Sequence, residues 1–236
     1  MSMKKITENA WLLALGNANA VLLCHGEELA LIDAGFPGKA QIVLDAIATL
    51  GKRPSDLKHL VFTHGHPDHI GSAAALVRAT GARTYMHEAN APLARTGGPF
   101  RPMTAAPGLM HKIMHRVVWN PNEQMEPFEI DQFIADGETL PIAGGLRVIH
   151  VPGHDAGQVA LVWQNSRLLI GGDVFMNIFG LADPVGFEDE AEGRRSQEKL
   201  AGLQFDAAVF GHGAAITSRA TERVQRKVRS MARAAA

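Results

Sequence analysis

The segment Phe62-Thr63-His64-Gly65-His66-Pro67-Asp68-His69-Ile70-Gly71 places three histidines and one aspartate within six residues, directly after an apolar run. Side chains two residues apart in an extended segment point the same way, so His64 and His66 can converge on one ion. Asp68 and His69 fall where the backbone begins to turn, which leaves room for a second ion nearby. The segment therefore predicts metal chemistry rather than a polar surface loop.

Two other residues of this segment predict a rigid backbone behind the histidines. Pro67 suits the first position of a helix, because it has no N–H group to leave unpaired. Gly71 has no side chain, so another stretch of backbone can approach it closely. The loop is therefore expected to present its ligands from a fixed framework.

Length and composition restrict the class of protein. A chain of 236 residues can form one α/β domain, and we expect residues 1–236 to be that domain. The net charge of −1 gives no field to attract nucleic acid. The single cysteine, Cys24, excludes an internal disulfide, and no leader-like or membrane-spanning apolar run occurs. We expect a soluble cytoplasmic protein that acts on a small molecule, without nucleic acid or membrane partners, in an oligomeric state that the sequence does not set.

The pattern of apolar residues predicts two strand-rich halves. The first contains strands at 10–15, 19–24, 28–32, 60–62 and 84–87, and helices at 39–50 and 72–80. The second contains strands at 132–135, 146–151, 158–163, 167–170 and 207–210, and helices at 192–203 and 219–232. Between them, residues from about 89 to 125 are rich in proline and carry a short helical piece at 109–115. This insertion predicts a flap with an apolar wall over a pocket.

Four further residues lie where predicted strands end. His154, Asp173 and His212 each follow an apolar strand and stand beside glycine. Asp33 ends an earlier strand, where its carboxylate can support a neighbouring loop by hydrogen bonds. Strand ends are common places for functional sites. With the first segment, His154, Asp173 and His212 make a set of five histidines and two aspartates, enough for two ions that keep room for water.

Together these residues resemble the five motifs of the metallo-β-lactamase superfamily, over a span from about Leu31 to His212. The resemblance implies an α/β fold of the α+β type, an αββα sandwich of two mixed β-sheets with helices outside and the metals at one edge. It also implies the ligand assignment: one ion on His64, His66 and His154, the other on Asp68, His69 and His212, and Asp173 between them. Asp33 would support the loop from behind.

The resemblance implies a dinuclear metal-dependent hydrolase that cleaves a carboxylic ester, lactone or thioester with a metal-bound hydroxide. Two zinc ions are the expected cofactors, with iron or manganese as alternatives. Asp68 is the expected catalytic residue, since it can orient the hydroxide and take up a proton.

Departures from individual members of the superfamily narrow the substrate. Only 24 residues follow His212, whereas glyoxalase II carries a helical C-terminal region for its glutathione thioester. The only tyrosine, Tyr85, is expected in a core strand, away from the position of the lactonase phenol. The β-lactamases of this fold lack the bridging aspartate, whereas Asp173 is present here, which disfavours β-lactams as substrates. β-Lactam cleavage, as a main or side activity, is therefore kept only as an alternative. The tRNA-processing nucleases need an RNA-binding surface that is not evident here.

Two other functional classes remain open. An iron-dependent sulfur (persulfide) dioxygenase uses the same fold, although such enzymes commonly leave part of the ligand set unused. A non-enzymatic zinc module is the other, but structural zinc sites are usually closed and cysteine-rich. The remaining histidines are expected to be structural or on the surface: His25, His59, His87, His111, His115 and His150.

Overall fold

The computed structural model describes residues 3–235; Met1, Ser2 and Ala236, the ends of the predicted domain, lie outside this range. The first sheet opens with an antiparallel meander and continues with parallel strands that alternate with helices. Its strands, in spatial order, are β1 (Met3–Thr7), β2 (Ala10–Ala14), β3 (Asn19–His25), β4 (Glu28–Ile32), β5 (Leu57–Val61), β6 (Arg83–Met86) and β8 (Gln132–Phe133).

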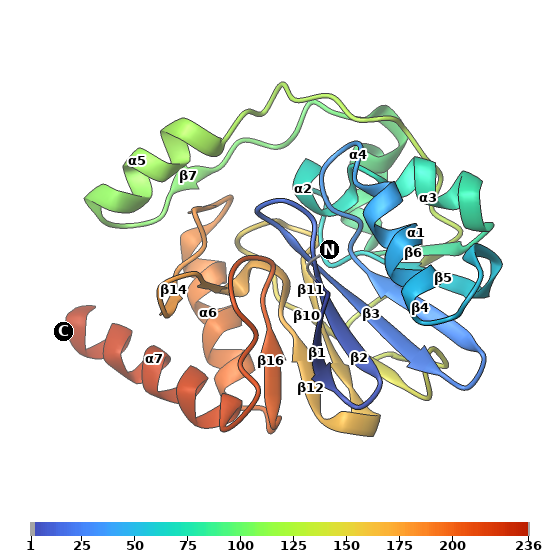
Figure 1. Cartoon of the computed structure of the whole chain (residues 1–236). Helices are drawn as coiled ribbons and strands as arrows, with labels where there is room; N and C mark the ends of the chain where they lie inside the picture. Colours follow the sequence, from blue (N-terminus) through green and yellow to red (C-terminus); the bar gives the residue numbers. More distant parts are fainter. Residues whose placement is uncertain (1–2, 236) are drawn as a thin grey trace.

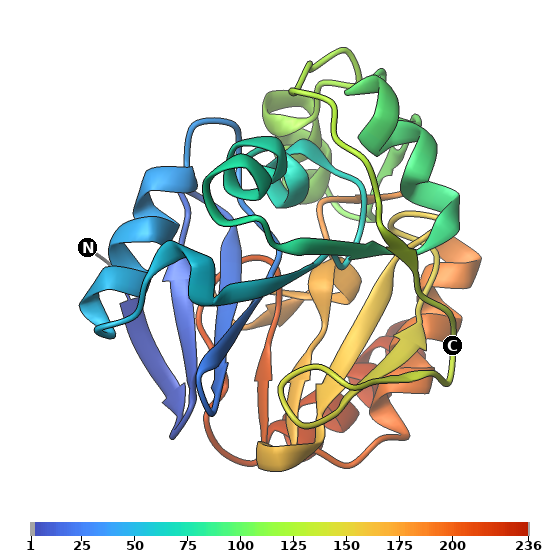
Figure 2. The same cartoon turned by 90° about the vertical axis from the view of Figure 1, so that its right-hand side faces the viewer.

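The second sheet is also mixed. Strand β12 pairs antiparallel with β11 and parallel with β16, so β10, β12 and β16 all run in one direction. In spatial order its strands are β16 (Ala207–Val209), β12 (Leu168–Ile170), β11 (Val159–Trp163), β10 (Leu146–His150) and β9 (Thr139–Leu140). Figure 2 shows the two sheets beside each other, with β1 to β4 of the first sheet in blue and β10 to β12 of the second in yellow and orange.

Three apolar clusters hold the layers together. One lies between the sheets and includes Val21, Val61 and Leu161. A second joins the outer face of the first sheet to α1 (Ala40–Thr49) and α3 (Ala73–Thr80). A third joins the second sheet to α6 (Glu190–Ala201) and α7 (Ala220–Ala235). Burial of apolar surface on both faces of each sheet yields the αββα sandwich, which confirms the predicted fold class (Figure 1).

The predicted strands and helices agree with the structure to within a few residues at most ends. Strand β1 was not predicted. It is an edge strand whose Lys4 and Lys5 are exposed, so its apolar content is too low to mark it in the sequence. Strand β8 falls in the strand predicted at 132–135, but other strands of two residues, such as β13 (Met176–Asn177) and β14 (Leu181–Ala182), are absent from the prediction, because so short a pairing leaves little periodic signal.

The predicted flap consists of short elements joined by irregular chain. They are η2 (Glu88–Asn90), α4 (Ala91–Thr96), β7 (Thr104–Ala105) and α5 (Leu109–Val118). Strand β7 pairs with β15 (Gly186–Phe187), so the flap is attached to the second half of the chain. Arg101 strengthens this attachment through Glu188, at 2.9 Å, and the buried Asp155, at 2.8 Å.

Short 3-10 turns complete the structure: η1 (Pro54–Asp56), η3 (Gln164–Ser166) and η4 (Gly172–Val174). Within residues 3–235, no helix combines the length and the apolar character needed to cross a membrane.

Candidate metal centre

The topology brings the ends of several strands to one edge of the sandwich. His64 and His66 follow β5, and Pro67 then starts the short helix α2 (Pro67–Ile70), which carries Asp68 and His69. His154, Asp173 and His212 follow β10, β12 and β16, three strands of the same direction in the second sheet. Residues from four separate segments of the chain therefore meet where the two sheets end together.

Asp33 holds the histidine loop from behind. Its Oδ1 accepts a hydrogen bond from the Thr63 backbone N–H at 2.8 Å, and its Oδ2 accepts from the Thr63 hydroxyl at 2.8 Å. The same Oδ2 accepts from Nδ1 of His69 at 2.9 Å. All three residues are buried. The supporting position predicted for Asp33 thus corresponds to three hydrogen bonds.

The acceptors around the imidazoles fix which ring nitrogen faces the centre. Thr63 Oγ1 lies 3.0 Å from Nδ1 of His64, and because its own proton goes to Asp33, it accepts from that nitrogen. Backbone oxygens of Gly186 and Asn17 lie 2.7 Å from Nδ1 of His154 and 2.8 Å from Nδ1 of His212. In each case Nδ1 is the nitrogen that donates to the backbone or to Thr63, so Nε2 faces the centre.

His66 takes the opposite orientation. Its Nδ1 lies 3.0 Å from Nε2 of His154, so this nitrogen, not Nε2, faces the other ligand candidates. The ring packs edge-on against Trp119 of the flap, with centroids 5.0 Å apart. The flap therefore touches the centre directly.

Several converging atoms have no protein partner. Among the described residues, Nε2 of His64, Nε2 of His69 and Oδ1 of Asp173 are buried without a hydrogen bond. A buried polar atom without a partner is costly, so such a group needs an explanation. Three overlapping sets of ligand atoms, each lying within 4.8 Å of one another, supply it: His64–His66–His154, His64–His69–Asp173 and Asp68–His69–His212. This donor set of imidazoles and carboxylates fits divalent metal ions.

The centre has two halves, one with His64, His66 and His154 and the other with Asp68, His69 and His212. Asp173 lies between them. Its Oδ2 is 3.0 Å from Nε2 of His212 and 3.6 Å from Nε2 of His154. Asp68 occupies the opposite side, with Oδ2 3.3 Å from His212 and 3.6 Å from His69. The two carboxylates thus place negative charge beside the imidazoles of His69, His154 and His212.

Electrostatics differ between the two halves of the metal-free centre. Burial lowers the pKa of His66 to about 3 and holds the pKa of His64 well below its usual value, so these two imidazoles are neutral at pH 7. Burial would also lower the pKa of His69, but neighbouring carboxylates, led by Asp68, raise it to about 9. Burial opposes ionisation of Asp68, yet His69 and His212 hold its pKa well below the usual range. Cations must displace protons from the second half, so metal affinity should fall as the pH falls.

Two glycines allow this close packing. A Cβ atom on Gly211 would collide with Oδ1 of Asp173 and with the ring of His69. A Cβ atom on Gly71 would collide with Pro37 and with the backbone oxygen of Pro67, which confirms the predicted close approach. Neither position tolerates a side chain without moving the candidate ligands or their helix.

Comparison with known proteins gives the same result as the geometry. A family model described as the metallo-beta-lactamase superfamily matches residues 13–212. The chain belongs to this superfamily. This confirms the resemblance proposed from the motifs, while the assignment of each ligand remains a prediction.

The individual relatives share only a modest fraction of identical residues with this chain. YflN of Bacillus subtilis (strain 168), named as a probable metallo-hydrolase, is 28% identical over 207 residues, which cover 80% of this chain and 76% of that protein. A hydroxyacylglutathione hydrolase of Anaeromyxobacter dehalogenans (strain 2CP-C) is 35% identical over 154 residues, 65% of this chain but 45% of that enzyme. A solved metallo-beta-lactamase of Cronobacter sakazakii has a TM-score of 0.75 at 22% identity, covering 99% of this chain and 93% of that one, which supports the fold alone.

In this superfamily member the centre opens into a cavity of about 600 Å³. His66, Asp68, His154, Asp173 and His212 line its floor. The flap contributes most of the opposite wall, and the turn after β13 contributes Ile178. The flap residues are Met103, Met114, Val118, Trp119, Asn120 and Glu123. The flap wall is thus mostly apolar, with Asn120 and Glu123 as its polar members.

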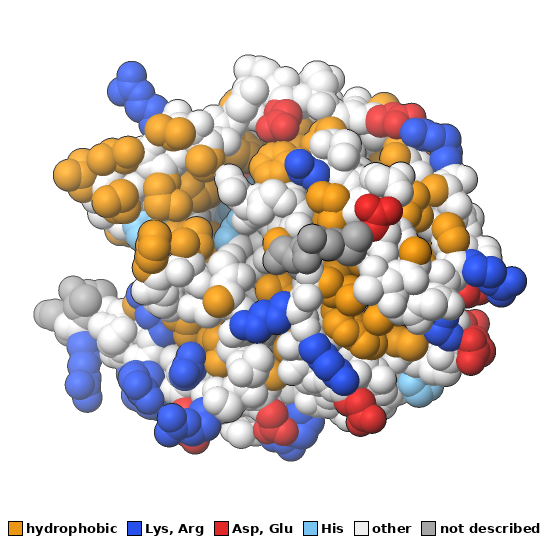
Figure 3. Space-filling model, in the orientation of Figure 1, with side chains coloured by type: hydrophobic (Ala, Val, Ile, Leu, Met, Phe, Trp, Pro, Cys, Tyr) orange, Lys and Arg blue, Asp and Glu red, His pale blue; other side chains and the backbone are white. Residues whose placement is uncertain are grey.

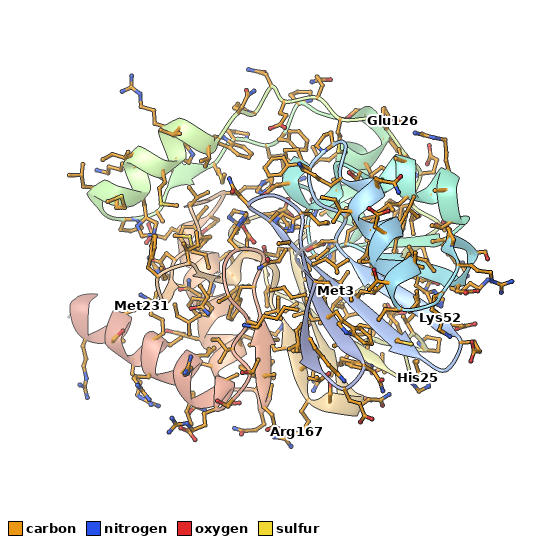
Figure 4. The ribbon with its side chains drawn as sticks, in the orientation of Figure 1. Met3, His25, Lys52, Glu126, Arg167 and Met231 are labelled. Atoms are coloured by element: carbon orange, nitrogen blue, oxygen red, sulfur yellow. The ribbon has the colours of Figure 1, made fainter. Side chains whose placement is uncertain are left out.

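Six histidines lie outside the three converging sets of ligand atoms. His25 is at the end of the sandwich away from α2 (Figure 4), and its Nδ1 lies 3.4 Å from Nδ2 of Asn165. His59 bonds the Tyr85 hydroxyl at 3.0 Å, which places the only tyrosine in the core as predicted. His87 and His150 stack on each other, with centroids 4.4 Å apart. In the flap, His115 approaches the backbone oxygen of Met103 at 3.1 Å, and His111 stands one helical turn before it.

Three supporting residues were missed by the sequence analysis. Thr63 orients His64, as described above. The side-chain amide of Asn19 donates to the backbone oxygens of Phe210 and Gly213 and fixes the loop of His212. Gln158 accepts from the Asp173 backbone N–H at 3.0 Å. Thr63 adjoins the histidine motif and could have been suspected, but no sequence signal distinguishes Asn19 or Gln158.

Proposed function

We propose that this protein is a dinuclear metal-dependent hydrolase that cleaves an ester-like bond. The observation that carries the proposal is the convergence of buried, unpartnered nitrogen and oxygen atoms next to a cavity that Asp173 lines and whose wall is mostly apolar. We assign one ion to His64, His66 and His154, the other to Asp68, His69 and His212, and Asp173 to both. Zinc is the proposed metal, because imidazole and carboxylate donors suit it.

The protein groups have separate roles in this mechanism. Bound zinc would supply a water of lowered pKa and polarise the substrate carbonyl. Asp68 lines the cavity and is in position to orient that water and accept its proton. Asp173 is buried between the halves and holds them together. The flap side chains would bind the apolar part of the substrate and exclude bulk water.

We further propose a carboxylic ester, lactone or thioester as the substrate. Relatives named as hydroxyacylglutathione hydrolases favour a thioester within this class. The cavity wall of Met103, Met114, Val118 and Trp119 favours small, fairly apolar substrates over phosphodiesters or highly charged compounds. β-Lactam cleavage would be a side activity, because Asp173 occupies the bridging position.

The proposed function predicts about two zinc ions per chain after zinc reloading, together with ester, lactone or thioester hydrolysis that exceeds β-lactam hydrolysis. Elemental analysis and a substrate panel test this. His111→Ala and His115→Ala serve as controls and should retain both metals, since neither histidine belongs to a converging set among the described residues. One ion or none would contradict the dinuclear centre. A coloured iron protein that consumes oxygen with a persulfide would favour the dioxygenase instead.

Replacing residues Leu109–Met114 by a short Gly/Ser linker should raise KM by about tenfold and leave kcat and metal content nearly unchanged. The linker spares β7, whose partner β15 provides the backbone oxygen that orients His154. It removes apolar area that would contact the substrate in the ground state and the transition state alike. Steady-state kinetics with an aryl ester and a lactone measure the effect.

Two single substitutions refine the flap experiment. Met114→Ser changes a side chain of the cavity wall and should raise KM, whereas Val117→Ser changes one that is 79% exposed and should not. A large fall in kcat with unchanged KM and full metal content would mean that the flap carries a catalytic group.

A further inference from the structure

The mouth of the cavity is bordered by large apolar side chains that face solvent. We call them the apolar rim: Leu109, Met110, Ile113, Val117 and Val118 of α5, and Ile178 and Phe179 of the turn between β13 and β14. Leu109 is 76% exposed and Phe179 fully exposed. None of the ten residues of α5 is buried. In Figure 3 the rim forms the orange surface that projects at the upper left.

The position of the rim argues against chance exposure. Leu109, Ile113 and Val117 recur every fourth residue, so they form one face of α5. Val118 and Ile178 belong to both the rim and the cavity wall, which makes the apolar surface continuous from the mouth into the cavity. Among the described residues, only Phe133 is a comparably exposed large apolar residue elsewhere. Concentrated apolar surface of this kind marks an interaction site.

A basic hollow lies next to the rim. It has a volume of about 440 Å³ and is bordered by the turn that carries Phe179 and by the side chains of α7. Glu222 is the one acidic residue that lines it. No ion pair within 4.0 Å is found in residues 3–235 for any of its four cations, Arg219, Arg223, Arg226 and Lys227. In Figure 3 the blue side chains at the lower left lie over this helix.

We propose that the apolar rim and the basic hollow together dock the protein on an anionic lipid bilayer. The rim would enter the interface between headgroups and acyl chains, and the hollow would accept lipid phosphates. Docking in this way turns the mouth of the cavity toward the lipid. A surface-docked protein needs no spanning segment, so the absence of one from the sequence does not oppose this partner.

Charge favours an anionic partner over a second copy of the chain. Helix α5 contains Lys112 and Arg116 and no acidic residue, so a contact between two rims would bring like charges toward the basic hollow. An anionic bilayer offers acyl chains to the apolar rim and lipid phosphates to the cations at the same time. The proposal concerns this surface alone and does not depend on the catalytic activity.

Vesicle co-sedimentation of the full-length protein tests the proposal. Binding to mixed phosphatidylcholine–phosphatidylglycerol vesicles should exceed binding to pure phosphatidylcholine by at least about tenfold at low salt, and high salt should weaken it. Ile113→Asp and Phe179→Asp should each reduce binding about tenfold or more. The double variant R226E/K227E should lose the preference for anionic vesicles.

Matched controls use similar side chains elsewhere on the surface. Phe133→Asp changes an exposed aromatic residue of β8, and Arg147→Glu changes an exposed cation of β10; both should bind like the parent protein. Thermal unfolding and metal content check that every variant is folded. Equal binding to both kinds of vesicle, or an equal loss in the controls, would overturn the proposal. So would the absence of vesicle binding with concentration-dependent self-association that Phe179→Asp abolishes, because the rim would then cover a second copy.

Discussion

Asp68→Asn should lower turnover by at least about a hundredfold while the protein remains folded. The substitution keeps the size of the side chain but removes the charge that faces His69 and His212, at 3.6 and 3.3 Å from Oδ2. The amide can neither accept the proton of the attacking water nor hold a cation as strongly. Turnover of an aryl ester, zinc content and thermal unfolding are the three measurements.

Asp45→Asn is the control for this prediction. Asp45 is a residue of α1, away from the metal centre, whose Oδ1 accepts a hydrogen bond from the exposed Gln41 side chain at 2.8 Å. Its replacement should leave turnover and zinc content unchanged. If Asp68→Asn retained turnover within a few-fold of the parent, with full zinc content, Asp68 would not be the catalytic carboxylate.

Asp33→Asn should weaken metal binding by about ten- to a hundredfold although Asp33 is no ligand candidate itself. Its two oxygens accept from the Thr63 N–H, the Thr63 hydroxyl and Nδ1 of His69. An amide offers one oxygen and an NH2 group, so at least one buried donor loses its acceptor, and His69 loses a neighbouring negative charge. Competition with a chelator measures the affinity for zinc.

Asparagine is the appropriate replacement because Asp33 has a positive φ of 64°. Asparagine tolerates this conformation better than alanine, so the variant isolates the hydrogen bonds from backbone strain. The free energy of unfolding is expected to fall by about 1–3 kcal/mol, because one buried donor is left unpaired. Unchanged zinc affinity would show that the backbone alone positions His69, and the supporting role assigned to Asp33 would be wrong.

The sequence by itself determined the local chemistry of this protein. Four candidate ligands and the start of helix α2 are contained in the segment from His64 to His69, where neighbouring residues are held together by the chain. Strand and helix periodicity was also readable, as for β3, β4 and α1, because each buries one regular face. Edge strand β1, with its exposed lysines, carried no such signal.

Only the tertiary structure decided which distant residues join that segment. His154, Asp173 and His212 meet because β10, β12 and β16 run in one direction and end at one edge, and this depends on strand pairing between residues far apart in the chain. For the same reason, the sequence alone did not indicate the roles of Asn19 and Gln158. Their hydrogen-bond partners lie 191 and 15 residues away in the chain. The helical pattern of α5 predicted a helix, but its isolation from the core, which leaves the apolar rim in solvent, follows from packing that local sequence does not encode.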